Sequence, residues 1–179
     1  ANCAAGRYLT ARGCALPHPD GDLRWLPDHP KWVQREDGGF RVEWRGPALI
    51  ALVTDAVTVE PLTVHRTWIQ PDGTKAPIPK PRKLWKALPK VGVCRLWSDD
   101  AVTLGLLVGE GIETTLAAAR GFGLGWATID AVNLRTLPVL DGVEVLTIVA
   151  DNDPPDLRGR RAGPRRDQAR PRIPVGRVE

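Results

Sequence analysis

The sequence has no methionine, only three cysteines and no long hydrophobic run. Cys3, Cys14 and Cys94 are widely spaced and form no C-x-x-C pair, which argues against a disulfide framework and a zinc ribbon. No stretch approaches the ~18 apolar residues of a membrane helix, and the first twenty residues lack the pattern of a signal peptide. We therefore expect reduced thiols, no zinc, no membrane association and a cytoplasmic location.

The excess of positive charge is concentrated at the C-terminal end. The whole chain has a net charge of +4, yet residues 154–179 alone contain eight arginines and three acidic residues. Residues 1–153 therefore carry a net charge of −1, so the overall charge is poor evidence for nucleic-acid binding. Residues 154–179 also contain five prolines, three glycines and no aromatic residue, which predicts a disordered Arg/Pro-rich tail.

The first half of the chain, residues 1–98, predicts a small mixed α+β subdomain. Residues 4–13 are typical of a short helix, and residues 23–44 alternate apolar pieces with Asp, Pro and Gly, as in brief strands or irregular loops. Strands are expected at 48–55 and 62–70, followed by a turn at Pro71-Asp72-Gly73. Residues 91–97 then form a strand that can pair with them.

The second half, residues 99–153, predicts an α/β unit. Residues 104–109 form a continuous apolar run, as in a strand that is buried on both faces of a parallel sheet. A helix over 112–121 with Gly121 as its stop, a short strand near 126–129, a helical turn at 133–137 and an apolar strand over 143–150 follow. This alternation indicates a parallel sheet flanked by helices.

Two acidic clusters come directly after apolar strands. Glu110 follows the strand over 104–109, and Asp151 and Asp153 follow the strand over 143–150. Ligands of open parallel sheets bind beyond the carboxyl ends of the strands, and converging carboxylates call for a cation. Each cluster alone would also suit a helix N-terminus or a capped turn. Their combination favours a Mg²⁺ site, which Mn²⁺ can also occupy, and phosphate chemistry.

The two acidic clusters lie in motifs that resemble a known family. The run V-G-E-G-I-E-T-T at 108–115 and the D-N-D-P at 151–154 resemble the Toprim domain of phage- and plasmid-type DNA primases and primase-helicases. Further likeness is carried by Y-L-T-A-R-G at 8–13, L-R-W-L-P at 23–27, H-R-T-W-I-Q-P-D-G-T-K-A at 65–76 and P-R-K at 81–83. The resemblance implies a Toprim-like parallel sheet preceded by a primase-type subdomain.

The same resemblance assigns roles to individual residues. It implies that Glu110 is a general acid and base in nucleotidyl transfer, that Asp151 and Asp153 bind the metal, and that Glu113 supports them or simply favours the helix dipole. The basic positions that match the family, expected to contact nucleotide or template phosphates, are Arg66, Lys75, Arg82 and Lys83. Trp68 or Trp85 offers a stacking face in this reading, and a core residue in the alternative one.

The activity implied is synthesis of RNA primers on single-stranded DNA from nucleoside triphosphates, with a replicative helicase as partner. A Toprim nuclease and a non-catalytic nucleic-acid-binding remnant remain as alternatives. The sequence lacks the zinc module of many primases, and after Asp153 it does not continue with the expected glycine, helix and strand. Truncation or a shifted reading frame would explain this change, and both are hypotheses.

Overall fold

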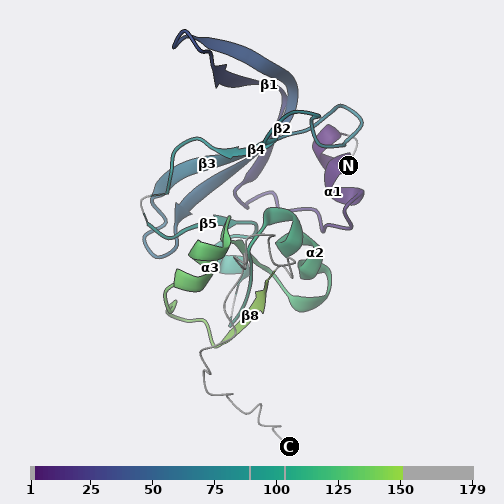
Figure 1. Ribbon diagram of the computed structural model, residues 1–179. Helices are drawn as coiled ribbons and strands as arrows, with labels where there is room; N and C mark the ends of the chain where they lie inside the picture. The colour runs from purple at the N-terminus through teal and green to yellow at the C-terminus, as the bar shows by residue number, and fades with distance from the viewer. Residues whose placement is uncertain (1–2, 89, 103, 151–179) are drawn as a thin grey trace, which may run out of the picture.

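The computed structural model describes residues 3–88, 90–102 and 104–150, which form an α/β fold with one mixed, curled sheet (Figure 1). The helices are α1 (Ala4–Thr10), the 3₁₀ turn η1 (Asp99–Ala101), α2 (Ile112–Phe122) and α3 (Ala131–Thr136). The strands are β1 (Leu23–Gln34), β2 (Phe40–Asp55), β3 (Pro61–Trp68), β4 (Arg82–Leu84), β5 (Gly92–Arg95), β6 (Gly105–Gly109), β7 (Gly125–Ala127) and β8 (Val145–Val149). No described helix is long and apolar enough to cross a membrane.

The sheet joins an antiparallel first half to a parallel second half. The strand order is β4-β3-β2-β5-β7-β6-β8, and β1 pairs with β2 outside this path. Strands β1 to β5 pair with one another in antiparallel fashion, whereas β6 pairs in parallel with both β7 and β8. The antiparallel pairing of β5 with β7 connects the two halves. One hydrogen-bonded sheet therefore spans the subdomain boundary that the sequence predicts at residue 98.

The parallel half contains the elements that the sequence predicts, with two differences. Leu106, Leu107 and Val108 of β6 are all buried, as expected for a central strand. Strand β8 is not, because its only described neighbour is β6, and Val145 and Ile148 are more than half exposed. Helix α2 runs past the expected stop at Gly121 and ends before Gly123, whose φ of 107° suits glycine.

The antiparallel half is more regular than the sequence predicts. In place of brief strands, β1 and β2 span 12 and 16 residues and form a long ribbon that extends away from the rest of the sheet (Figure 1). Bulges between Leu26 and His29, and between Lys31 and Trp32, interrupt the β1–β2 register. Because β1 is an edge strand with bulges, it accommodates the prolines that made the sequence look irregular.

Helix α1 and the turn after β3 pack closely together. Tyr8 and Leu9 of α1 are buried in the main core, as expected. The predicted turn is present, and its Gly73 has a φ of 91°. A Cβ atom at this position would lie 2.8 Å from the Tyr8 backbone nitrogen, so only glycine fits between the turn and the helix.

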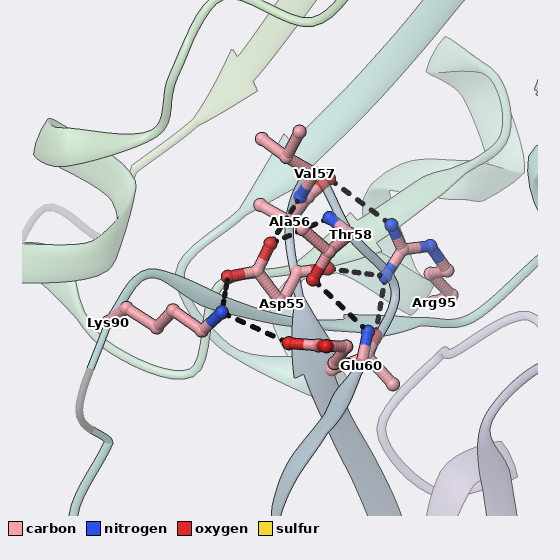
Figure 2. A network of polar contacts seen from close by, with 8 residues as sticks. Asp55, Ala56, Val57, Thr58, Glu60, Lys90 and Arg95 are labelled. Atoms are coloured by element: carbon pink, nitrogen blue, oxygen red, sulfur yellow. Dashed lines mark hydrogen bonds and ion pairs between the residues drawn. The ribbon is translucent and has the colours of Figure 1, made fainter.

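A buried arginine holds the junction between the two halves of the sheet (Figure 2). Arg95 of β5 is 5% exposed, and its guanidinium donates to the backbone oxygens of Asp55 and Ala56, each at 3.2 Å, and to Asp99 at 2.7 Å. The neighbouring Asp55 carboxylate accepts bonds from two backbone amides and pairs with Lys90 at 3.1 Å. These bonds hold the pKa of Asp55 well below its usual range.

Candidate carboxylate site

Glu110 lies at the rim where two parallel strands end together. Strands β6 and β8 are neighbours, and their last register pair joins Gly109 to Val149. Glu110 follows Gly109 directly, and Asp151 is the second residue after Val149 in the sequence. The condition for the predicted site, that the two strands be adjacent and parallel, is therefore met. Asp151 and Asp153 themselves lie outside the described residues, so their meeting with Glu110 stays a prediction.

The backbone around Glu110 is fixed by the start of α2. A Cβ atom on Gly109 would lie 2.3 Å from the Thr115 hydroxyl oxygen, so the strand approaches the helix more closely than any other residue allows. The Gly109 oxygen accepts a bond from the Thr128 amide at 2.9 Å, and the Thr115 hydroxyl donates to the Gly111 oxygen at 2.7 Å. Glu110 is half-buried within this turn.

Glu113, in the first turn of α2, connects the helix to the first half of the chain. The Tyr8 hydroxyl donates a hydrogen bond to its carboxylate, and Arg82 lies 3.6 Å from the second carboxylate oxygen. Burial raises the pKa of Glu113, but the Tyr8 bond and the charges of Arg82 and Lys75 outweigh burial and bring the pKa below its ordinary value. Glu113 is thus held ionised. The pKa of Tyr8 is raised by burial and by the Glu113 charge, which keeps its hydroxyl protonated.

Two cations act on the ionised Glu113, and a third lies at the neighbouring Tyr8. Arg82 forms an ion pair with Glu113. Lys75 interacts electrostatically with both Glu113 and Arg82. The guanidinium carbon of Arg12 lies 3.9 Å from the centroid of the Tyr8 ring. Burial and the charges of Arg82 and Arg12 lower the pKa of Lys75, while Glu113 opposes this change. One carboxylate therefore neutralises Arg82 and Lys75 only in part, with Arg12 close to Lys75, and an added anion such as a phosphate would relieve the repulsion between these cations.

The sheet separates the four predicted phosphate contacts into two groups. Directly opposed residues of an antiparallel pair share one face of the sheet, and Thr67 opposes Arg82 whereas Arg66 opposes Lys83. Arg82, together with Lys75, therefore lies near Glu113, and Arg66 and Lys83 lie on the opposite face. The register thus brings only two of the four cations to the carboxylates.

The two candidate stacking tryptophans also differ. Trp68 is 1% exposed and stacks on His29 with ring centroids 5.8 Å apart, so it is a core residue, as the alternative reading held. Trp85 is 60% exposed. A stacking role is therefore open to Trp85 alone of the pair.

Sequence reasoning missed several members of the Glu113 cluster, which consists of Glu113 and its neighbours Tyr8, Arg12, Cys14, His65, Lys75 and Arg82. Tyr8 was expected only to pack, and Arg12, Cys14 and His65 were not expected near the site. The Cys14 thiol lies 3.4 Å from the Glu113 backbone oxygen. Burial lowers the pKa of His65 to about 4, with Arg82 and Arg66 adding to this effect and Glu113 opposing it. The available signal was the four-residue spacing of Tyr8 and Arg12, which suits one face of the expected helix over 4–13, although α1 ends at Thr10.

Two further features bear on ligands. Across residues 3–88, 90–102 and 104–150, no three His, Cys, Asp or Glu side chains are grouped so that they would hold a metal ion, and these ranges do not include Asp151 and Asp153. A cavity of about 390 Å³ lies away from Glu113, between Arg95, Asp99, Trp126 and residues 139–143. The Arg95 donors in its wall are already bonded to protein oxygens.

Comparison with known proteins identifies part of the chain. Residues 1–96 match the family described as a domain of unknown function (DUF7146). This region contains α1, β1 to β5 and the four basic residues, and it ends before Glu110 and Glu113. No curated protein and no solved structure matches the chain.

Proposed function

The chain belongs to the DUF7146 family, and from the geometry of its β6–β8 rim we propose that it is a Toprim-type nucleotidyltransferase of the DNA primase class. In this proposal it makes RNA primers on single-stranded DNA from nucleoside triphosphates and magnesium. The second half of the sheet is then a Toprim-like core, and the first half is the primase-type subdomain. A replicative helicase is its expected partner.

The observation that carries the proposal is the pairing of β6 with β8. Because the strands are parallel and Gly109 opposes Val149, the segments that begin with Glu110 and with residue 150 leave the sheet at one rim. Carboxyl ends of parallel strands are where such sheets bind their ligands. This arrangement supports a shared site for Glu110, Asp151 and Asp153.

The Glu113 cluster adds a second line of support. Lys75 and Arg82 come from the first half of the chain and meet Glu113, which lies three residues beyond Glu110. Cations beside an acidic rim suit a substrate that carries a triphosphate, because the phosphates neutralise cations and metal together. We therefore assign Lys75 and Arg82 to nucleotide phosphates.

The donor set fits a hard cation. Glu110, Asp151 and Asp153 offer only carboxylate oxygens, which Mg²⁺ and Mn²⁺ prefer, and no sulfur or imidazole donor is included. Asp151 and Asp153 would hold the ion, which stabilises negative charge on the phosphoryl group when bound. Glu110 would accept the proton of the attacking hydroxyl as a general base. Glu113 would keep Arg82 in place through their ion pair.

Primer synthesis by Glu110→Gln protein tests the proposal. The full chain, with single-stranded template, nucleoside triphosphates, Mg²⁺ and a helicase, is expected to make primers, and Glu110→Gln is expected to abolish them. Glu144→Gln, at an exposed glutamate before β8, is the matched control and should retain synthesis. Binding of Mn²⁺, followed by electron paramagnetic resonance, should be lost in Asp151→Asn/Asp153→Asn protein.

The outcome also separates the alternatives. Nicking of plasmid DNA with Mg²⁺ alone, without primer synthesis, would identify a nuclease that uses the same carboxylates. Folded protein that neither makes primers nor binds Mn²⁺ through Asp151 and Asp153 would overturn the enzymatic proposal and leave a non-catalytic module.

A further inference from the structure

We propose that the outer face of the β1–β4 sheet, formed by Arg24, Ile50, Arg66, Lys83 and Trp85, binds a single strand of nucleic acid. This outer face lies on the side of the sheet opposite Arg82 and the Glu113 cluster. Identification of the bound strand as a primase template rests on the proposed function. The binding itself does not, because it requires neither Glu110 nor a metal ion.

The strand register arranges three cations in one row. Arg24 opposes Ile50, Ile50 opposes Arg66, and Arg66 opposes Lys83, so these residues cross all four strands on a single face. Neighbouring strands lie about 4.8 Å apart, which spreads the row over three strand spacings. Arg24 and Lys83 at its two ends are exposed. A row of this kind presents positive charge along a line, as a phosphate backbone requires.

Trp85 lies beside this row and is held by Arg66. The Trp85 amide donates to the Val64 oxygen at 2.9 Å, which continues the β3–β4 pairing by one residue and places Trp85 on the face of Arg66. The Arg66 guanidinium carbon lies 4.8 Å from the Trp85 ring centroid and 5.0 Å from that of Trp68. Because Trp85 is 60% exposed despite this contact, its indole is available to stack on a base.

The charge around Trp85 distinguishes nucleic acid from a protein partner. Residues 75–90 contain six basic residues and no acidic one, and of these Arg82 pairs with Glu113 and Lys90 pairs with Asp55 and Glu60. The described register rows through Ala48, Ile50 and Leu52 on this face likewise contain no carboxylate. By contrast, the exposed Trp32 on the β1–β2 ribbon has an Arg35–Asp37 ion pair nearby in the sequence. Trp85 therefore combines an exposed indole with the cations of the Arg24–Ile50–Arg66–Lys83 row.

An unpaired strand fits these features better than a duplex. Stacking on Trp85 requires a base whose face is accessible, and bases in a duplex are stacked on each other. The lysines and arginines would contact phosphates without reading the sequence. We therefore expect tight binding to a single strand of any sequence and weaker binding to the duplex.

Fluorescence anisotropy with a labelled oligothymidylate of about 12 nucleotides tests this inference. The full chain is titrated in EDTA, so that binding is measured without any metal. Trp85→Ala should weaken binding at least about tenfold, Trp85→Phe should retain part of it, and Trp32→Ala should change it less than about twofold. Lys83→Gln should reduce the slope of log affinity against log salt by about 0.7, and Arg135→Gln on α3 should not.

Two results would overturn the inference: equal binding by the Trp85→Ala and Trp32→Ala proteins, or duplex bound as tightly as single strand. Circular dichroism of each variant establishes that it is folded. Glu110→Gln protein should bind the oligonucleotide normally. Strand binding without primer synthesis would therefore reject the proposed function alone, and primer synthesis that is unaffected by Trp85→Ala and Lys83→Gln would reject the outer face as the template site.

Discussion

The Tyr8 hydroxyl donates a hydrogen bond to the Glu113 carboxylate, a residue 105 positions further along the chain. This bond joins α1, inside the family region, to α2, outside it. Tyr8 is fully buried, and Glu113 is mostly so. The orientation of the first turn of α2, and with it the turn that carries Glu110, therefore depends on a residue near the start of the chain.

Tyr8→Phe should lower the free energy of unfolding by about 1.5–3 kcal/mol, because it removes a hydrogen bond to a charged and buried acceptor while the ring still packs. Urea unfolding followed by tryptophan fluorescence measures this change. Thr136→Ala removes an exposed hydroxyl bond at the end of α3 and should change stability by less than about 0.5 kcal/mol. An equally small effect of Tyr8→Phe would contradict a structural role for this bond.

Gly109→Ala should destabilise the protein by about 1–3 kcal/mol, because the added Cβ overlaps the Thr115 hydroxyl and forces strand and helix apart. Gly111→Ala is the matched control on the other side of Glu110. There the nearest atom lies 3.5 Å from the added Cβ and φ is −107°, so the change should cost only the N-cap preference for glycine over alanine, about 0.5 kcal/mol. Thermal unfolding of the two variants gives the comparison, and equal melting temperatures would refute the close approach at Gly109.

Arg95→Met should cost about 3–5 kcal/mol, since it leaves buried oxygens of the β2–β3 turn and Asp99 without their donor. Arg45→Met provides the control, because its ion pair with Asp28 is exposed and is expected to contribute less than about 1 kcal/mol. Both values follow from urea unfolding curves. Similar losses in the two variants would show that the Arg95 network does not hold the junction.

His65 should make stability depend on pH between about 4 and 6.5. Its pKa in the folded protein is about 4, below the ordinary 6.5, so the unfolded chain takes up this proton first as the pH falls. Its contribution is complete above pH 6.5, declines through this window and is fully lost below pH 4, a loss on the order of 3 kcal/mol. In His65→Gln this part of the pH dependence should disappear.

The free energies of unfolding of wild type and His65→Gln are measured between pH 7 and about 4. Their difference separates the contribution of His65 from that of the carboxylates that titrate in the same range. His18→Gln is the control, because His18 is exposed beside Asp20. Parallel pH curves for wild type and His65→Gln would contradict the burial of a neutral imidazole at this position.

The parallel half of the fold was largely predictable from sequence, and in the antiparallel half α1, β3 and β5 were predictable whereas the long β1–β2 ribbon was not. An apolar run such as 104–109 has one plausible environment, a strand covered on both faces, and the following helix shows its own period. In β1, by contrast, Pro27 and Pro30 are typical of a loop in the sequence. A long strand is possible there only because β1 is an edge strand with bulges. Local patterns do not report such a position in the sheet.

The candidate site was predictable only in part for a related reason. Glu110 was found because it directly follows a recognisable strand. The approach of Tyr8 to Glu113, and the division of Arg82 from Lys83 between opposite faces, depend on helix packing and strand register. A shift of one residue in the register would exchange the two faces, and no local pattern in residues 75–90 fixes it.

The end of the family match falls beside a strand pairing of this chain that crosses it. Residue 96 lies one residue beyond β5, whose Cys94 and Arg95 pair with Ala127 and Trp126 of β7. A chain that ended there would lack β7, so β5 would become an edge strand. Val93 and Cys94, which are fully buried, would then become exposed to solvent. In this chain the edge of the matched region is thus completed by β7, a strand that lies outside the match.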